Sequence, residues 1–250
     1  MTTKAQDEPP HVQRSTACSI DMHVHTTFGS TDSSLTTDEL VEVSRTAAIG
    51  GFVVTEHGQQ WQPHQVRRVA DASGLFACGA AEWACEYGHV LVLGVDPMTR
   101  YAGPIETMRT IVQSQGGFMI FAHPFRYFPG PMSLLFGRWK NAERRTPSEL
   151  AEHPAFAFID EIEVLNNGCT DHENDLALAV AHALGMQGTG GSDAHSAAEV
   201  GRCVTVFQEP LSTPGDLLQQ LRSGRFHAAR QAADGRLLHV STSLPRRGPV

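Results

Sequence analysis

The sequence lacks several features that would place it in well-known classes. Its 250 residues include only five cysteines, an odd number with no C-x-x-C spacing, which argues against a disulfide framework or a zinc knuckle. No apolar run approaches the roughly 18 residues that span a bilayer, and the polar start lacks the charged-then-apolar layout of a secretory signal. We therefore expect a cytoplasmic protein with reduced thiols and no membrane partner.

Lysine and excess positive charge are also scarce. The formal net charge is -8, and of the 19 lysines and arginines only Lys4 and Lys140 are lysine. A nucleic-acid footprint needs a clustered basic face, so the composition argues against nucleic acid as a partner and favours a small substrate. The arginine excess suits phosphate recognition, although genomic base composition explains it better along the chain as a whole. Nothing in the composition indicates an oligomeric state.

Short β-rich runs alternate with helical patterns along the chain, which is typical of a parallel sheet wrapped by helices. A single α/β domain is expected over residues 18–232, between a flexible N-terminal arm (1–17) and a C-terminal tail (233–250). Residues 124–154 carry early prolines and a basic cluster, and are predicted to form a lid or insertion. About seven β/α units suggest a closed or nearly closed barrel.

The element boundaries follow from periodicity and capping signals. Strands are expected over 19–23, 51–54, 75–81, 90–94, 118–122, 156–164, 186–189 and 203–207. Helices are expected after the N-cap Thr36, around Arg67, over 104–115, over 175–184 and after the N-cap Thr213.

An H-x-H pair in the first predicted strand is the most informative motif. Side chains at i and i+2 of a strand point to the same face, so His23 and His25 can bind one divalent ion. Such a pair alone is more often solvent-facing, but in parallel barrels the active site lies where strands end, and metal-ligand residue types recur there in this chain. These further residues are Asp32, His57, Glu82, His89, His123, Asp193 and His195. Together they predict a polynuclear metal site.

Taken together, these motifs resemble the PHP family, the polymerase and histidinol phosphatase domain. The matching blocks are the H-x-H start, Thr-Glu-His57, Glu82 followed by Gly-His89, Ala-His123-Pro and the terminal Gly-Ser-Asp-Ala-His195. The match runs from about Ser19 to Arg225. It implies an α/β fold, a distorted, TIM-like (β/α)7 barrel in a single domain, with two to three divalent metal ions such as Zn, Mn or Fe.

The resemblance also implies how the ligands are shared. The first ion would be held by His23, His25, Glu82 and Asp193, the second by Asp32, His57 and His195, and the third by Glu82, His89 and His123, with Glu82 bridging. One departure is Glu56, which stands where the family usually has an aspartate before the histidine of the second block. That residue normally supports a ligand rather than binding metal, so the change affects how His57 is oriented.

Several other residues have predicted roles. Arg126 is the candidate phosphate clamp, and together with Asp193 and His195 it forms the predicted catalytic set. Asn166 is predicted to line the pocket and Glu163 to be structural. Glu86 rivals Glu82 as a ligand, but Glu82 has the better spacing to His89. A solvated helix face is expected for Arg138, Lys140, Arg144 and Arg145, and a surface position for His11, His64, His153, His172, His182, His227 and His239.

The resemblance implies a metal-dependent phosphoesterase that hydrolyses a phosphate ester of a small molecule or nucleotide through a metal-bridging hydroxide. The ions would dominate the local field, so an acidic chain can still attract a small anionic phosphorylated substrate. A phosphomonoesterase is favoured because the chain carries no second binding module.

Three alternatives stay open. The first is a phosphodiesterase or exonuclease acting on nucleic acid or a cyclic phosphate. The second is a metallohydrolase of the amidohydrolase type, which commonly uses a carboxylated lysine on a strand, whereas neither lysine here lies on a predicted strand. The third is a noncatalytic binding module, against which the full set of ligand residues argues.

Overall fold

The computed structural model describes residues 18–232 and 234–240, so the predicted N-terminal arm, His11, and residues 233 and 241–250 of the predicted tail lie outside the described residues. The strands are β1 (Ser19–Val24), β2 (Gly51–Glu56), β3 (Phe76–Cys85), β4 (Gly88–Leu93), β5 (Phe118–Phe121), β6 (Glu161–Asn166), β7 (Thr189–Gly191), β8 (Cys203–Phe207), β9 (Phe226–Gln231) and β10 (Leu237–His239). The helices are α2 (Thr37–Thr46), α3 (Pro63–Ser73), α4 (Ile105–Ser114), α5 (Pro147–Leu150), α6 (Asp171–Leu184) and α7 (Pro214–Arg222), with 3-10 helices at Ala142–Arg144 and Pro154–Phe158.

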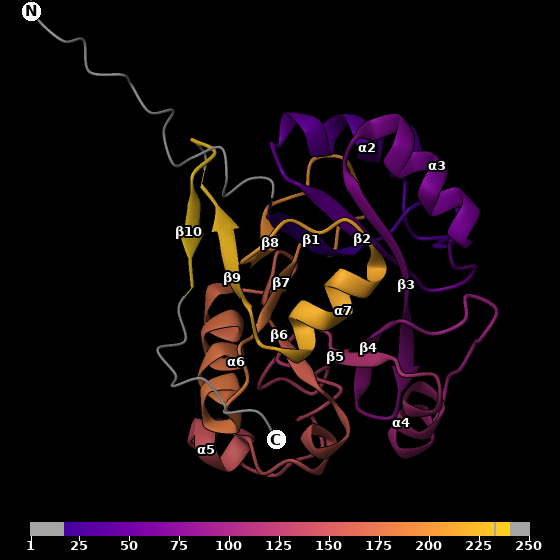
Figure 1. The fold of residues 1–250 in the computed structure, drawn as a ribbon. Coiled ribbons are helices and arrows are strands. Elements are labelled where there is room, and N and C mark those ends of the chain that lie inside the picture. Colours follow the sequence, from indigo (N-terminus) through magenta and orange to yellow (C-terminus); the bar gives the residue numbers. More distant parts are fainter. Residues whose placement is uncertain (1–17, 233, 241–250) are drawn as a thin grey trace, which may run out of the picture.

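The strands form one curled sheet in the order β10-β9-β8-β1-β2-β3-β4-β5-β6-β7 (Figure 1). Its far edge returns to β1, where Val24 forms a parallel bridge with Ala194 and the Asp193 amide donates to the His23 carbonyl at 2.7 Å. Strands β1 to β7 therefore enclose a distorted, TIM-like barrel, as the sequence predicts. Strands β8 to β10 extend the sheet from β1 with antiparallel pairing.

Strand β4 departs from the parallel pattern, because it is antiparallel to both β3 and β5. Only Glu86 and Tyr87 separate β3 from β4. A connection of this length permits a hairpin, whereas a parallel crossover needs a dozen or more residues. Gly88 adopts a φ of 135° at this turn, which a residue with a side chain rarely adopts.

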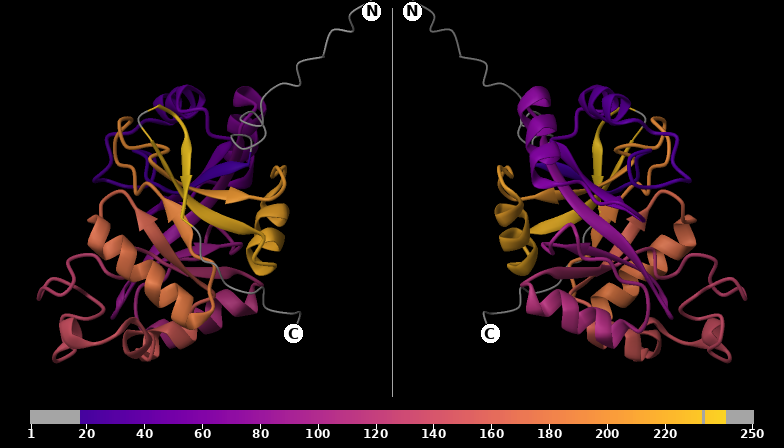
Figure 2. Two further views of the ribbon diagram at one scale, coloured as in Figure 1. Left: turned by 90° about the vertical axis from the view of Figure 1, so that its left-hand side faces the viewer. Right: turned by 90° about the vertical axis from the view of Figure 1, so that its right-hand side faces the viewer.

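The helices lie around the outside of the curled sheet (Figure 2). Strands β1, β2 and β6 are buried along their whole length, as expected for strands covered on both faces. Helix α4 packs Ile105, Met108 and Val112 inward, at the spacing that the sequence indicates. Each such side chain contributes about 1.5–3 kcal/mol when fully buried.

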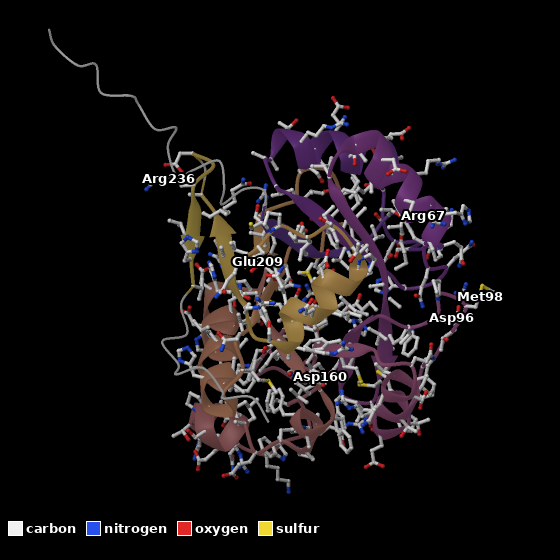
Figure 3. The ribbon with its side chains drawn as sticks, in the orientation of Figure 1. Arg67, Asp96, Met98, Asp160, Glu209 and Arg236 are labelled. Carbon is white, nitrogen blue, oxygen red and sulfur yellow. The ribbon has the colours of Figure 1, made fainter. Side chains whose placement is uncertain are left out.

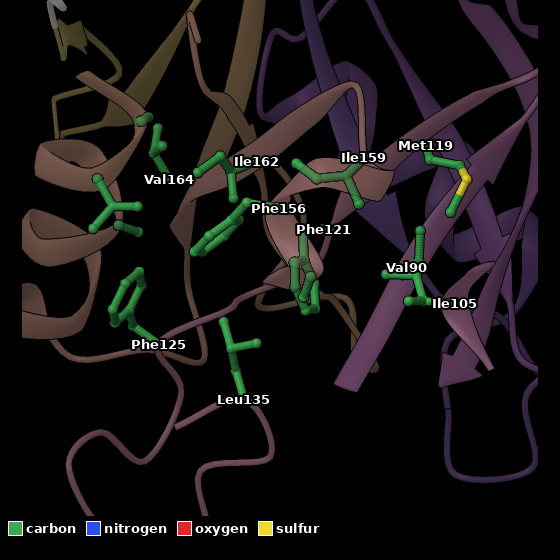
Figure 4. Packing of buried hydrophobic residues seen from close by; sticks show 14 of the residues in the cluster. Val90, Ile105, Met119, Phe121, Phe125, Leu135, Phe156, Ile159, Ile162 and Val164 are labelled. Carbon is green, nitrogen blue, oxygen red and sulfur yellow. The ribbon is translucent and has the colours of Figure 1, made fainter. Parts of the chain in front are cut away.

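Residues 124–154 form turns, a 3-10 helix and the short α5, and they are anchored rather than free. Phe125, Leu135 and Phe136 are at most 4% exposed and join the main core cluster. Phe125 and Leu135 belong to the same cluster as Phe121 of β5 and Phe156 of the 3-10 helix Pro154–Phe158 (Figure 4). The insertion therefore forms a fixed wall of the molecule.

The basic cluster of this insertion lies on turns and a 3-10 helix instead of the expected α-helical face. Arg138, Lys140 and Arg144 are exposed, as predicted. Arg145 instead stacks over the Trp139 ring, with 4.2 Å between the guanidinium carbon and the ring centroid. This contact is a cation–π interaction. Arg145 is therefore not part of the solvated face that the sequence predicts for the four basic residues.

The prediction that His153 lies on the surface is wrong. Its ring is 6% exposed and lies 5.0 Å from Trp139 and 5.2 Å from Tyr87, measured between centroids. The aromatic side chains of the insertion close over this histidine, and its Nδ1 accepts a hydrogen bond from the Ala155 amide. Burial lowers the pKa of His153 to about 4.

Some element boundaries also differ from the prediction. The strand expected over 156–164 is a 3-10 helix followed by β6, because Pro154 favours a helical start. Helix α6 begins at Asp171, four residues before the predicted start at 175, since Thr170 and Glu173 form a capping box. Within the predicted C-terminal tail, β10 is an ordered strand paired with β9. No helix of the described part is long and apolar enough to cross a membrane.

Candidate metal centre

The nine predicted ligands converge at one end of the barrel, although they come from segments far apart in the sequence. The strands place each of them. His23 lies in β1, Glu82 in β3 and His89 in β4. Loops that follow four of the strands supply the others: His25 and His57 directly follow β1 and β2, His123 lies two residues after β5, and Asp193 and His195 lie two and four residues after β7. Asp32 comes from the loop between β1 and α2. The end of the sheet thus gathers imidazoles and carboxylates in one place.

Within the described residues, three groups of possible ligands have donor atoms that all lie within 4.8 Å of one another. They are His23, His25, Glu82 and Asp193; His25, His57 and His195; and Glu82, His89 and His123. The first and third groups are the sets that the family resemblance implies. In the second group His25 takes the place expected for Asp32, whose Oδ2 nevertheless lies 3.4 Å from Nε2 of both His57 and His195.

Glu82 occupies the middle of the cluster, and its two oxygens face different histidines. Oε1 lies 3.0 Å from Nδ1 of His89 and 3.2 Å from Nε2 of His123. Oε2 lies 3.2 Å from Nε2 of His25 and 3.3 Å from Nδ1 of His57. The side chain is 1% exposed. This is the geometry of a bridging carboxylate.

In the first group, His23 and His25 point their unprotonated Nε2 atoms at each other. Their Nε2 atoms are 3.0 Å apart. Nδ1 of His23 lies 3.0 Å from the buried carboxylate of Glu163, which fixes the proton on Nδ1 and leaves a lone pair on Nε2. Two such lone pairs, both also 3.2–3.4 Å from carboxylate oxygens of Glu82 and Asp193, repel one another unless a cation lies between them.

The spacing of the donor atoms fits a divalent ion. Ligand atoms at about 2.1 Å from one ion lie roughly 3.0–3.4 Å apart at octahedral or tetrahedral angles. The separations within the first group are 3.0–3.4 Å. Imidazole and carboxylate donors suit Zn, Mn and Fe. The cluster therefore has the donor set and spacing of a divalent metal centre, and the ion held by each group stays a prediction.

Glu56 supports His25 through a chain of hydrogen bonds. Ser30 donates to Oε2 of Glu56 at 2.6 Å, so its oxygen is free to accept from Nδ1 of His25 at 3.2 Å. Trp61 donates to Oε1 of Glu56 at 3.1 Å. The same Ser30 oxygen accepts from the backbone amide of His57 at 3.2 Å. The glutamate thus reaches His57 only through its backbone, and it orients the ring of His25.

Two carboxylates of the cluster, Glu82 and Asp193, are held in their charged form. Burial raises the pKa of Glu82, but the surrounding imidazoles, His23 foremost, outweigh it and bring that pKa well below its usual range. Burial acts in the same way on Asp193, and His23, His25, His123 and Arg126 together lower its pKa below the ordinary value. Anionic oxygens are the form that a metal requires.

Arg126 reaches the cluster from the insertion. Its Nη2 donates to Oδ2 of Asp193 and, at 2.9 Å, to Oδ1 of Asn166. Its Nε is buried and has no hydrogen-bond partner among the described residues. Asn166 also donates to Glu163 at 2.9 Å. Arg126, the predicted clamp, therefore lies at the edge of the cluster, and Asn166 lies beside it. The prediction that Asn166 lines the substrate pocket stays a prediction.

Two carboxylates with supporting roles were missed or misjudged from the sequence. Glu163, predicted to be structural, contacts the His23 ring and accepts from the backbone amide of His123 at 2.9 Å. Asp21 accepts from the Ser192 amide and hydroxyl at 2.8 and 2.6 Å, and from the Gly201 amide at 2.8 Å. Burial raises the pKa of Asp21 to about 6. Its position two residues before His23 on the same strand face was the available signal.

Glu86 is not a rival ligand, because it points to α4. Its Oε2 accepts from the Ile105 amide at 2.9 Å and so satisfies a free donor at the helix N-terminus. Among the remaining histidines, His64, His172 and His239 are exposed as predicted, whereas His182 and His227 are half-buried. His227 contacts His239 across β9 and β10. None of these lies in the three ligand groups of the described residues.

Comparison with known proteins supports the same family. The PHP-associated family model matches residues 171–226. No curated protein matches the chain. Among solved structures, PsfC from Pseudomonas syringae PB-5123 is similar at 18% identity and a TM-score of 0.60, over 87% of this chain and 92% of that protein.

Two further structures have the same fold. A two-domain protein from Bacteroides vulgatus, which contains a predicted PHP-like metal-dependent phosphoesterase, is 17% identical with a TM-score of 0.58, over 84% of this chain and 64% of that protein. An amidohydrolase from Chromobacterium violaceum with bound sulfate is 16% identical with a TM-score of 0.57, over 87% of this chain and 99% of that protein. The predicted resemblance to the PHP family is thus confirmed by the fold and the family model.

Proposed function

We propose that this chain is a metal-dependent phosphoesterase that hydrolyses the phosphate ester of a small molecule, and that it is a phosphomonoesterase. The observation that carries the proposal is the 3.0 Å approach of the Nε2 atoms of His23 and His25 beside two anionic carboxylates. When bound, divalent ions lower the pKa of water and stabilise charge on a phosphoryl group. The match to the PHP-associated family model and the similarity to the Bacteroides vulgatus protein, which contains a predicted PHP-like metal-dependent phosphoesterase, support this chemistry at the level of the family.

The residues around the cluster have separate roles in this proposal. Glu82, which belongs to two of the ligand groups, would hold two ions. Asp193 would be a ligand and is also the partner of Arg126, so the guanidinium is held at the edge where a phosphate would arrive. His195 is half-exposed next to Asp32, and its Nδ1 is fixed by the Asp193 carbonyl at 2.9 Å. We assign His195 to ion binding through Nε2, because its other ring nitrogen is held by the Asp193 carbonyl.

A small anionic phosphorylated substrate is favoured over nucleic acid. The chain carries a net charge of -8, and the exposed basic residues of the insertion are few. An extended polyanion is bound best by a clustered basic face, and a chain with this excess of acidic residues is poorly suited to form one. The binding of single-stranded DNA with a steep salt dependence would favour the exonuclease alternative instead.

The amidohydrolase alternative is weakened by the position of lysine. Lys140 is the single lysine of the described residues, and it is exposed on the insertion. It therefore cannot supply a bridging carboxylated lysine on a strand. The carboxylate at the corresponding central place is Glu82.

The test combines metal analysis of the purified protein with a phosphate-release screen over sugar phosphates, nucleotides and cyclic diesters. We expect two to three equivalents of Zn, Mn or Fe, and release of phosphate from a monoester. His123→Ala and Asp193→Asn are expected to abolish turnover and to leave the circular dichroism spectrum unchanged. Full activity of both variants, or a metal-loaded protein inert to every ester, would overturn the proposal.

A further inference from the structure

A groove of about 340 Å³ lies directly beside the candidate metal centre. His89 and His123, two ligands of the third group, line its inner end together with Arg126. Its other walls come from the β3–β4 turn, β5 and the insertion, and they are largely apolar: Tyr87, Phe121, Tyr127, Met132, Leu134 and Leu135. A molecule bound at the ions would extend into this space.

The outer wall of the groove exposes large apolar side chains to solvent. Tyr127 is 54% exposed, Met132 66% and Leu134 61%. The other large apolar residues exposed in the described part, Phe28, Met98 and Leu238, come from separate segments. Exposed apolar side chains that gather at one place mark a binding surface more often than a structural one.

The wall is held in position before anything binds. Phe125, Leu135 and Phe136, which flank the exposed residues in sequence, are at most 4% exposed in the core cluster. The rings of Phe125 and Phe136 stack with 4.8 Å between centroids. A groove that is fixed in this way loses little conformational entropy when a ligand binds.

We propose that this groove takes the leaving group of the phosphate ester, and that the leaving group is an uncharged apolar alcohol, either an alkyl chain or a single aromatic ring. This inference rests on the proposed function. The charged and imidazole groups of the groove, Arg126, His89 and His123, lie where the phosphate would be. Beyond them the named wall side chains offer two hydroxyls, those of Tyr87 and Tyr127. The several hydroxyls of a sugar would therefore lose more water in the outer groove than they gain in partners, which is costly.

The reaction is a hydrolysis and needs no further co-reactant. The oxygen of water bonds to phosphorus, the bond from phosphorus to the alkyl oxygen breaks, and a proton passes to that oxygen. The products are inorganic phosphate and an apolar alcohol, which leaves through the open outer end of the groove.

The first experiment compares methyl, butyl and hexyl phosphate with glucose 6-phosphate on the metal-loaded protein. The alkyl alcohols have nearly equal acidity, so the chemical step stays constant along the series. We expect kcat/KM to rise by about fourfold for each added methylene until the groove is filled. We expect glucose 6-phosphate to fall below butyl phosphate. Equal values for all three alkyl esters would overturn the proposal.

Binding provides a second readout that does not depend on turnover. Methylphosphonate and hexylphosphonate cannot be hydrolysed, and calorimetry on the metal-loaded protein gives their affinities. If hexylphosphonate binds more tightly than methylphosphonate but no ester is hydrolysed, the groove binds apolar groups and the proposed function is wrong. If esters are hydrolysed with no dependence on chain length, the proposed function is right and the assignment of the groove is wrong.

Matched variants test whether the groove causes the dependence of kcat/KM on chain length. The double variant Met132→Gln with Leu134→Gln removes apolar surface from the groove wall at exposed positions, so the fold is expected to stay intact. Met98→Gln is the control, since Met98 is 72% exposed and projects from the right-hand edge of the molecule, outside the groove (Figure 3). The double variant should flatten the dependence on chain length and Met98→Gln should keep it. The reverse pattern, or a double variant with the full dependence, would reject the assignment.

Discussion

Nδ1 of His23 lies 3.0 Å from Oε1 of Glu163, and both side chains are completely buried. Burial lowers the pKa of His23, but Asp193, Glu163 and Glu82 together outweigh it and raise that pKa well above its usual value. In the absence of a cation the ring would therefore bind a proton. With a cation present, Glu163 holds the remaining proton on Nδ1 and directs Nε2 at the ion.

Glu163→Gln is expected to weaken metal binding without unfolding the protein. The amide oxygen can still accept from Nδ1, but the amide nitrogen then faces the His123 backbone amide and Asn166, which both donate to the glutamate. The lost charge also makes Nε2 a poorer donor, so affinity should fall by about 10- to 100-fold. Competition with a fluorescent chelator measures this. Glu152→Gln on the exposed surface is the matched control and should bind metal like the wild type. Unchanged affinity in Glu163→Gln would show that the contact does not tune the ligand.

The variants Glu82→Gln and Glu86→Gln test which of the two glutamates binds metal, since the sequence makes both candidate ligands. Glu82 faces histidines of two groups with different oxygens, so its loss should reduce the bound metal to one equivalent or less. Glu86 caps α4, and glutamine can still accept from the Ile105 amide, so metal content should not change. Inductively coupled plasma analysis of both variants decides the matter. A loss of metal in Glu86→Gln would contradict the site as described.

The ligand positions could be predicted because their residue types stand out where strands end. His57, His123 and His195 each follow an apolar or glycine-rich run, and the barrel brings strand ends together whatever the intervening chain does. Glu163 could not be recognised in the same way, since it lies within a strand that reads as buried core. Its partner His23 is 140 residues away in sequence, and only the closed sheet brings the two together.

The antiparallel β4 and the buried His153 were missed for a related reason. A hairpin between β3 and β4 follows from the two-residue connection, but the strand boundaries that define this length were uncertain by several residues in the sequence. His153 follows Leu150 and precedes Phe156, but apolar neighbours in sequence do not show that a ring is covered on both faces. Trp139 and Tyr87, which cover its ring, come from other segments, and the sequence pattern does not pair them.

Acid should destabilise the protein in part through His153. Burial lowers its folded pKa to about 4, whereas the ordinary value is 6.5. Between these two pH values the unfolded chain binds a proton that the folded chain does not, so the free energy of unfolding falls as the pH falls from 6.5 to 4. Allowing for screening by solvent, the loss is expected to reach about 1–2 kcal/mol at pH 4.

The variant His153→Asn tests this pH dependence, because its side-chain oxygen can accept from the Ala155 amide but does not titrate. Urea unfolding at pH 7 and pH 4 should show a smaller difference between the two pH values in His153→Asn than in the wild type. His64→Asn, at an exposed position, is the control and should keep the full difference. Identical pH dependence in all three proteins would mean that His153 takes up a proton in the folded state.

Gly191→Ala is expected to damage both stability and metal binding, because the barrel closes tightly around β7. An added Cβ would lie 2.4 Å from Cβ of His23 and 2.7 Å from Oε1 of Glu163, so the first ligand and its supporting carboxylate would both have to move. Overpacking of this kind costs about 1–3 kcal/mol. Gly215→Ala is the matched control, since its nearest neighbour, Oγ1 of Thr213, would be 3.5 Å away in ordinary contact. Alanine in the first turn of α7 should leave stability unchanged or raise it by about 0.5 kcal/mol. Urea unfolding of the metal-free proteins gives the free energy of unfolding, and chelator competition gives the metal affinity. If Gly191→Ala is as stable as Gly215→Ala and binds metal as tightly, the contact between β7 and His23 is looser than these distances indicate.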